Sequence, residues 1–205
     1  DKNFVLWLEC RNAGKTTLIA IYVMLRSLLI PYHATYLLGN VGSQSKEIFD
    51  KMEKIITRRI PSFGNLNDVF ESELRRDGAN STGFKHDPTS FELRLFNEST
   101  VNTLNSDPTN IKGKRADLVV FDEAGWFSNE LFVQAEAFTN QDENFVLGGT
   151  KDMATEPKGF PKQLLYASSA SDTSSEFYKK FRNIGERMLI GDNKYFVVNY
   201  DANML

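Results

Sequence analysis

The chain has 205 residues, a length that favours one α/β domain of ordinary size over two small ones. Its residues are 41% hydrophobic and 25% charged, a balance typical of a globular chain and not of one with long disordered stretches. The formal net charge of −3 at pH 7 excludes a globally basic nucleic-acid binder, but it does not exclude a local basic patch.

The first third of the chain alternates strand and helix patterns. Residues 4–8 form a short, continuous apolar run, which is typical of a strand buried on both faces. Residues 16–30 are apolar on almost every side and predict a buried helix that stops at Pro31. Residues 34–38 predict a second strand. We expect a second helix that has Ser43 as its N-cap and ends before Pro61. Its apolar residues share one face: Ile48, Phe49, Met52, Ile55 and Ile56.

The rest of the chain continues this alternation after a less regular stretch. Residues 75–90 are polar and contain glycines and a proline, so they predict a loop. Residues 91–96 and 99–104 alternate apolar and polar positions around Asn97 and Glu98, which predicts an antiparallel hairpin. Strands are predicted at 118–121, 164–167 and 195–198, helices at 129–138 and 175–187, and a loop at 148–161. This order predicts an α/β sandwich around a mostly parallel sheet, in which ligands gather at the carboxyl ends of the strands.

A phosphate-binding motif lies between the first strand and the first helix. Gly14 allows close backbone approach, Lys15 supplies a positive charge, and the Thr16 hydroxyl can ligate Mg²⁺. A complete P-loop has glycine five residues before Gly14, where this chain has Glu9. The strand before the motif and the helix after it favour a nucleotide-binding loop over a chance match. The residues expected to contact the nucleotide here are Cys10, Arg11, Asn12, Ala13, Gly14, Lys15, Thr16 and Thr17.

A second motif ends the strand at 118–121 with two carboxylates. Two carboxylates at the end of a buried strand, Asp122 and Glu123, carry a high desolvation cost unless a cation binds to them. We therefore expect Asp122 to hold Mg²⁺ and Glu123 to polarise the water that attacks the γ-phosphate. The alternative is that the acidic pair caps the helix that follows, near Ser128.

A third motif of small residues follows the strand at 164–167. The hydroxyls of Ser168 and Ser169 can hydrogen-bond the attacking water or the γ-phosphate and so sense its loss. The alternative is that Ser168, Ser169 and Ala170 are ordinary turn residues.

Several cations are candidates for a finger that neutralises charge in the transition state. Arg11 lies within the phosphate loop, and Lys112 and Arg115 belong to a basic cluster upstream of Asp122. The alternative for that cluster is a solvated turn before a strand. His33 and His86 stand apart from any Cys or His at ligand spacing, so the sequence assigns neither a role.

Together these motifs resemble a known family, the large terminase subunits that package DNA in tailed bacteriophages. Residues 10–17 resemble that family's deviant, arginine-bearing Walker A motif, and residues 116–125 its Walker B strand with the catalytic glutamate. Residues 165–170 resemble its coupling motif. Residues 97–99 in a hairpin and 112–113 before Walker B also follow its layout. The resemblance extends from residue 4 to about residue 200.

The resemblance implies a RecA-like P-loop ATPase of the ASCE type, with a mostly parallel sheet flanked by helices and a β-hairpin. It implies ATP and Mg²⁺ as cofactors, with Lys15 and Thr16 at the phosphates and the ion, Asp122 supporting Mg²⁺, and Glu123 as the base. It further implies a homo-oligomeric ring, usually a pentamer, that drives double-stranded DNA into a procapsid. The implied partners are the portal protein and the small terminase subunit, and the implied place is the host cytoplasm.

The chain departs from the family pattern in two respects. The family often has Arg where this chain has Lys112, so Lys112 and Arg115 both stay candidates for the trans-acting finger. The family's C-terminal nuclease domain is not in this chain, so we expect residues 1–205 to form a single ATPase domain. The longest apolar run of the first helical region, residues 18–25, is too short to span a bilayer, which takes about 20 residues. No membrane partner is therefore expected.

Two other functions compete with the packaging motor. Residues 122–124 and 168–170 also resemble motifs II and III of superfamily 2 helicases, of which this chain would be the first RecA-like half. Stimulation of hydrolysis by single-stranded but not double-stranded DNA would favour the helicase. A nucleotide-binding module without turnover is the third candidate, supported by Glu9 in place of glycine.

Overall fold

The computed structural model describes residues 2–10, 13–39, 42–57, 64–76, 83–87, 90–104, 111, 113–140 and 161–200, with the backbone alone described at 42–44 and 64–67. The strands are β1 (Phe4–Glu9), β2 (Ala34–Gly39), β3 (Phe84–His86), β4 (Phe91–Arg94), β5 (Thr100–Leu104), β6 (Leu118–Asp122), β7 (Gln163–Ser168) and β8 (Tyr195–Tyr200). The helices are α1 (Lys15–Leu29), α2 (Gly42–Ile56), α3 (Gly64–Glu73), α4 (Asn129–Glu136) and α5 (Glu176–Leu189), with short 3₁₀ turns η2 (Ala124–Trp126) and η3 (Ala137–Thr139).

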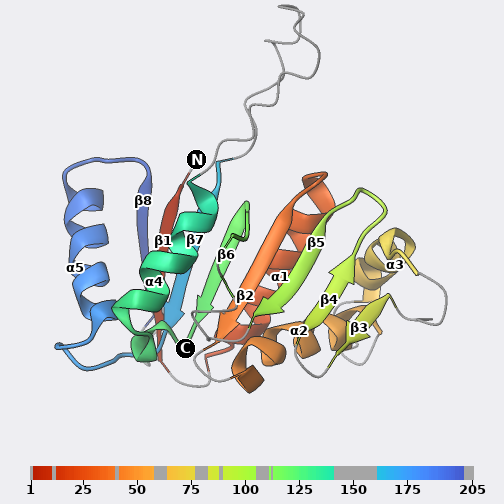
Figure 1. Cartoon of the computed structure of the whole chain (residues 1–205), viewed down its shortest axis with the longest axis horizontal. Coiled ribbons are helices and arrows are strands. Elements are labelled where there is room, and N and C mark those ends of the chain that lie inside the picture. The colour runs from red at the N-terminus through yellow and green to blue at the C-terminus, as the bar shows by residue number, and fades with distance from the viewer. Residues whose placement is uncertain are drawn as a thin grey trace, which may run out of the picture.

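The strands form one sheet in the order β3-β4-β5-β2-β6-β7-β1-β8 (Figure 1). The neighbouring strands β5, β2, β6, β7, β1 and β8 pair in parallel. At the other end of the sheet, β3 pairs with β4 and β4 with β5 in antiparallel orientation. The hairpin predicted around Asn97 and Glu98 is confirmed as β4 and β5. The mostly parallel α/β fold predicted from the alternation of strands and helices is confirmed as well.

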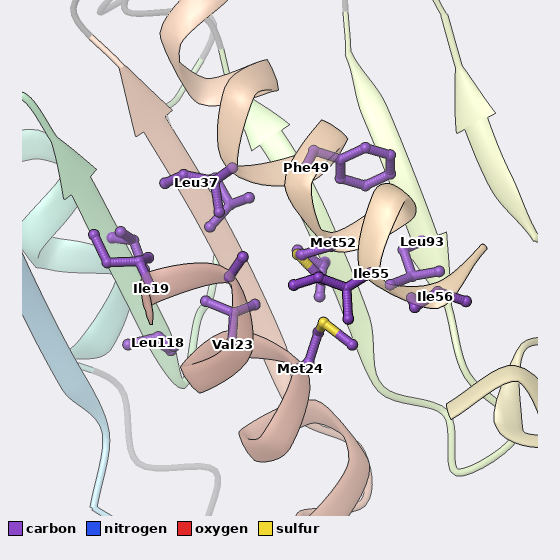
Figure 2. Close-up of a cluster of buried hydrophobic side chains, with 14 of the residues drawn as sticks. Ile19, Val23, Met24, Leu37, Phe49, Met52, Ile55, Ile56, Leu93 and Leu118 are labelled. Atoms are coloured by element: carbon purple, nitrogen blue, oxygen red, sulfur yellow. The ribbon is translucent and has the colours of Figure 1, made fainter. Parts of the chain in front are cut away.

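Helices cover the two faces of the sheet, each over its own apolar core. Leu118 and Val120 of β6 face the core under α1, α2 and α3, and Val119 and Phe121 face the core under α4 and α5. Figure 1 shows α4 in front of the sheet and α1 behind it. In the first core α1 and α2 pack side by side on the central strands (Figure 2). The five apolar residues predicted on one face of the second helix are all buried there.

Three local expectations differ from the structure. Helix α2 begins at Gly42, so Ser43 lies in its first turn and is not its N-cap. Helix α3 was not predicted, because its sequence offers few apolar positions, of which Phe70 is buried. Strand β3 lies inside the predicted loop at 75–90, where the buried Phe84 packs edge-on against Phe49. The predicted loop at 148–161 lies outside the described residues except for its last one.

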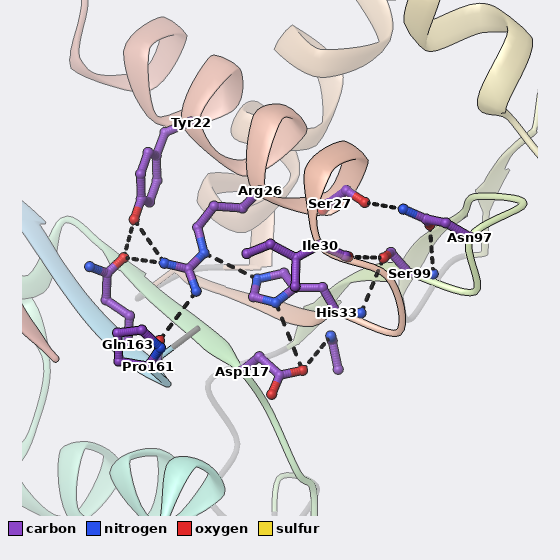
Figure 3. Close-up of polar contacts among 11 residues, drawn as sticks. Tyr22, Arg26, Ser27, Ile30, His33, Asn97, Ser99, Asp117, Pro161 and Gln163 are labelled. Carbon is purple, nitrogen blue, oxygen red and sulfur yellow. Dashed lines mark hydrogen bonds and ion pairs between the residues drawn. The ribbon is translucent and has the colours of Figure 1, made fainter. Parts of the chain in front are cut away.

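A polar network joins helix α1 to the amino ends of the parallel strands (Figure 3). The Arg26 guanidinium donates to His33 Nε2, to the Gln163 side-chain oxygen and to the Pro161 carbonyl, each at 3.3 Å. Burial, reinforced by the nearby Arg26 charge, lowers the pKa of His33 to about 3. His33 is therefore neutral, and its Nε2 can accept the Arg26 hydrogen bond. The network fastens α1 to the segments that begin β2 and β7.

The carbonyl end of α1 is capped from the hairpin at the same edge. The Asn97 side-chain amide donates to the Ser27 carbonyl at 2.8 Å and to the Leu28 carbonyl at 3.1 Å. Ser99 Oγ donates to the Ile30 carbonyl at 2.8 Å. These side chains satisfy carbonyls that the end of a helix leaves without partners. No helix among the described residues is long and apolar enough to cross a membrane.

Candidate nucleotide-binding site

The parallel pairing brings three sequence motifs to one edge of the sheet. Leu8 is in register with Ser168, and Asp122 is in register with both Ala167 and Gly39. The ends of β1, β6 and β7 therefore lie side by side at the carboxyl edge. Ligands of open α/β sheets bind at this edge, which is where the sequence predicts the site.

A cavity of about 550 Å³ opens at this edge. It is lined by Cys10, Ala13, Gly14, Lys15, Thr16, Thr17, Glu47, Lys51, Asp122, Glu123, Trp126 and Ser169. Gly14 is the N-cap of α1 and has a φ of 93°, a left-handed conformation that favours glycine. The N-terminus of α1, with its positive dipole, therefore borders the cavity.

Lys15 lies between the two carboxylates of the second motif. Its Nζ is 2.6 Å from Glu123 Oε1 and 3.6 Å from Asp122 Oδ1. Burial raises the pKa of Asp122 to about 6, and the Glu123 charge adds to this effect while Lys15 opposes it. The ammonium of Lys15 is thus shared between two acids.

A third carboxylate, Glu9, is buried near Lys15. Glu9 is 3% exposed, and its Oε2 has no hydrogen-bond partner among the described residues. Burial raises the pKa of Glu9, and the charge of Lys15 partly offsets this rise. Among the described residues, Asp122, Glu123 and Glu47 line the cavity with one carboxylate more than its two lysines balance, and carboxylate oxygens fit a divalent cation such as Mg²⁺.

The end of β7 holds the turn that carries Glu123. Glu123 itself has φ 54° and ψ 44°, a left-handed conformation that is strained for a residue other than glycine. The Gly125 N–H donates to Ser168 Oγ at 3.1 Å, and Ser171 Oγ donates to the Gly125 carbonyl at 3.2 Å. A Cβ on Gly125 would lie 2.8 Å from the Ser171 Cβ and 3.0 Å from Ser168 Oγ. The Gly125 peptide is therefore clamped on both sides.

The two serines of the third motif have different surroundings. Ser169 lines the cavity, and its Oγ donates to Glu123 Oε2 at 3.4 Å. Ser168 is 1% exposed and does not line the cavity, because its hydroxyl accepts the Gly125 N–H. The geometry thus supports Ser169 as a nucleotide neighbour and Ser168 as a residue that positions the Glu123 turn.

The alternative role for the acidic pair is wrong. Helix α4 has Ser128 as its N-cap, and Ser128 Oγ accepts the Leu131 N–H at 3.4 Å. Asp122 and Glu123 instead face Lys15 across the cavity.

The finger candidates are separated by the fold. Arg115 is exposed and precedes β6, whereas Asp122 ends it, so a strand of about 16 Å lies between Arg115 and the cavity. Arg115 therefore does not reach the cavity of its own chain. Arg11, Asn12 and Lys112 lie outside the described residues, and their roles stay predictions.

Three lining residues were missed from the sequence. Glu47 and Lys51 lie one turn apart on α2 and both face the cavity, and Trp126 lies three residues after Glu123 with 67% of its surface exposed. The i, i+4 spacing of Glu47 and Lys51 on the polar face of α2 is a signal that could have suggested a shared face. Nothing in the sequence places that face beside the phosphate loop.

Comparisons with known proteins identify the fold. No protein-family model matches the chain, and no curated protein matches it. Among solved structures, the large terminase from a thermophilic bacteriophage is similar with a TM-score of 0.63 and 13% identity, covering 99% of this chain and 41% of that one. The HK97 bacteriophage large terminase is similar with a TM-score of 0.63 and 14% identity, covering 98% of this chain and 36% of that one.

A nucleotide complex is among the similar structures. The large terminase of the same thermophilic bacteriophage, in complex with ATP-γ-S, has a TM-score of 0.61 and 13% identity, covering all of this chain and 41% of that one. The chain thus spans about two fifths of the length of the thermophilic phage terminase it matches. At these identities the likeness shows the fold, and it confirms the fold that the motifs predicted.

Proposed function

We propose that this chain binds Mg-ATP at the carboxyl edge of its sheet and hydrolyses it to power the translocation of double-stranded viral DNA into a procapsid. The observation that carries the proposal is Lys15 Nζ held 2.6 Å from Glu123 inside a cavity bordered by the glycine turn and the N-terminus of α1. The fold that the chain shares with large terminases supports the same reading, as does the solved complex of the thermophilic phage terminase with ATP-γ-S.

In this proposal the phosphate groups compete with the acids for Lys15. The N-terminus of α1 and the Lys15 ammonium receive the phosphates, and Lys51 adds a second cation from α2. Glu123, released from Lys15, then accepts the proton of the attacking water. Ser169 orients that water or the carboxylate of Glu123 through its hydroxyl.

Thr16 and Asp122 are the residues that would hold Mg²⁺. Both line the cavity, and a cation beside the Asp122 carboxyl would oppose the burial that raises its pKa. When bound, Mg²⁺ supplies positive charge that offsets the phosphate oxygens. Arg11 in the same chain, and Lys112 or Arg115 from a neighbour, are the candidates that complete this neutralisation.

Replacement of Glu123 by Gln tests the proposal. The amide keeps the shape of the side chain but cannot accept a proton, so we expect phosphate release to fall by about 100-fold or more. ATP affinity, measured by calorimetry, should change less than about threefold. Glu130→Gln on the exposed face of α4 is the matched control and should leave both values unchanged. Loss of ATP binding in Glu123→Gln would contradict the assigned role.

The nucleic acid and the partners are tested separately. If the chain is the motor domain of a packaging ring that acts on a portal with a small terminase subunit in the host cytoplasm, double-stranded DNA should stimulate its ATP turnover. Stimulation by single-stranded DNA alone would favour the helicase. Mg-ATP binding without any phosphate release would favour the nucleotide-binding module, for which Glu9 beside the phosphate loop is the specific observation.

A further inference from the structure

A second cluster of potential metal ligands joins α2 to β3, and none of its three residues lines the nucleotide cavity. Asp50 and Glu53 are three residues apart on α2, a spacing that puts their side chains on one face. His86, the last residue of β3, reaches the same place from the sheet. One ligand atom from each of the three side chains lies within 4.8 Å of the other two. The closest pair is His86 Nε2 and Glu53 Oε2, at 3.0 Å.

The imidazole of His86 is held in place by aromatic rings. Its centroid is 4.7 Å from that of Phe91 and 5.9 Å from that of Phe49, and both contacts are edge-to-face. These contacts fix the plane of the imidazole independently of its hydrogen bond to Glu53. The ring is therefore oriented toward the carboxylates before any ion binds, which lowers the entropic cost of ligation.

The charges of the cluster are not balanced within the part of the chain that the structure describes. Asp50 is half-buried, and its carboxylate forms no hydrogen bond or ion pair with a described residue, although the Glu53 carboxylate is close. Two neighbouring lysines have other contacts: Lys46 Nζ lies 4.6 Å from the centre of the Phe91 ring, and Lys85 pairs with Glu92 at 3.8 Å. Two carboxylates this close are stabilised when a cation lies between them.

We propose that Asp50, Glu53 and His86 bind one divalent transition-metal ion of the zinc class. Two carboxylates and one imidazole leave a fourth tetrahedral position for water, a ligand set that suits Zn²⁺. An imidazole ligand argues against Mg²⁺ and Ca²⁺, which prefer oxygen. Tetrahedral bonds of about 2.1 Å place the ligand atoms about 3.4 Å apart. The present ligand atoms lie within 4.8 Å of one another, so rotation of the three side chains suffices to reach this tetrahedral geometry.

The ion would fasten β3 to α2. The same helix presents Glu47 and Lys51 to the nucleotide cavity, so the metal would also steady one wall of that cavity. The proposal does not depend on the proposed ATPase activity, because its ligands are separate from Lys15, Asp122 and Glu123.

Calorimetric titration of the metal-stripped, nucleotide-free protein with Zn²⁺ tests the site. We expect one ion per chain and a loss of affinity of about 100-fold in each of Asp50→Asn, Glu53→Gln and His86→Gln. Asp87→Asn, which removes the carboxylate next to His86 outside the cluster, is the matched control and should bind like the wild type. Thermal melting without metal checks that each variant folds, and Zn²⁺ should raise the melting temperature of the wild type and the control only.

Replacement of Zn²⁺ by Co²⁺ gives a spectroscopic signature of the ligand set. Intense visible absorption indicates tetrahedral Co²⁺, and it should disappear in His86→Gln. Zn²⁺ binding that persists in all three variants would overturn the proposal, because the ion would then bind elsewhere, such as the nucleotide cavity. Equal competition by Mg²⁺ at the same concentration would overturn the assignment to the zinc class.

Discussion

The two edges of the parallel sheet carry polar clusters of opposite character. At the amino edge the Arg26 guanidinium donates to neutral His33 and to Gln163, and the Asn97 amide caps two carbonyls at the end of α1. At the carboxyl edge Lys15 is shared between two acids, and Glu9 keeps an oxygen without a partner among the described residues. Both clusters rest on the same helix, because α1 begins at Lys15 and has Arg26 in its last turn.

This difference in pairing distinguishes polar groups that support the fold from polar groups that are available to a ligand. Polar groups that are fully paired in the free protein stabilise it and gain little from a ligand, whereas groups left short of partners gain from a ligand that completes them. We therefore expect changes at the amino edge to lower stability while sparing nucleotide binding. Changes at the carboxyl edge should lower binding or turnover at little cost in stability.

The largest effect is expected for Lys15→Ala, which removes the shared ammonium. A charge-assisted hydrogen bond of this kind is worth about 3 kcal/mol, so ATP affinity should fall by about 100-fold or more. Calorimetry with Mg-ATP measures the change, and Lys54→Ala on the exposed side of α2 is the control. Unchanged ATP affinity in Lys15→Ala would show that the nucleotide binds elsewhere in the molecule.

Gly125→Ala should act on turnover rather than on binding. The added Cβ meets the side chains of Ser171 and Ser168, so the turn that carries Glu123 must shift. A misplacement of about 1 Å costs up to about 100-fold in rate, and we expect a loss approaching this with ATP affinity kept. Gly185→Ala on α5 is the control, because a Cβ there has nothing within 4 Å. Wild-type turnover in Gly125→Ala would show that the clamp has no part in positioning Glu123.

His33 should make the amino edge sensitive to acid. Its pKa is about 3 in the folded chain and about 6.5 unfolded, so the unfolded state binds the extra proton first as pH falls. Its contribution to stability is complete above pH 6.5, and about 2 kcal/mol of it is lost by pH 5. Urea unfolding of the wild type and His33→Gln at pH 8 and pH 5 measures this difference. An equal loss in both proteins would assign the acid sensitivity to other groups.

The smallest effect is expected for Glu9→Gln. The substitution removes a buried negative charge near Lys15, so Mg-ATP should bind about fivefold tighter, equivalent to about 1 kcal/mol. A nucleotide titration at pH 8, where more of the Glu9 carboxyl is ionised than at lower pH, detects the change. Weaker binding would instead mean that Glu9 supports the phosphate loop.

The sequence predicted the carboxyl edge better than the rest of the molecule. Gly14, Lys15 and Asp122 are specified locally, because a strand, a tight turn and a helix follow each other within a few residues. The roles of Lys51 and Trp126 depend on how α2 and η2 lie across the cavity, which no local pattern encodes.

The polar network at the amino edge could not be predicted from the sequence either, because it too depends on tertiary packing. Arg26 and His33 are near each other in the chain, but Gln163 is 137 residues from Arg26 and meets it only because β7 enters the sheet between β6 and β1. Strand β3 and helix α3 were missed because three residues and a weak apolar pattern carry too little periodicity.

Hydrogen–deuterium exchange with and without Mg-ATP-γ-S compares the two edges in one experiment. The account predicts slower exchange of backbone amides at residues 13–18 and 122–126 when nucleotide is present. Exchange at residues 26–33 and 97–99 should not change, because Arg26, Asn97 and Ser99 already bond to protein groups there and lie at the opposite edge of the sheet. Protection at the amino edge, or none at the carboxyl edge under saturating nucleotide, would contradict the assignment of the functional site.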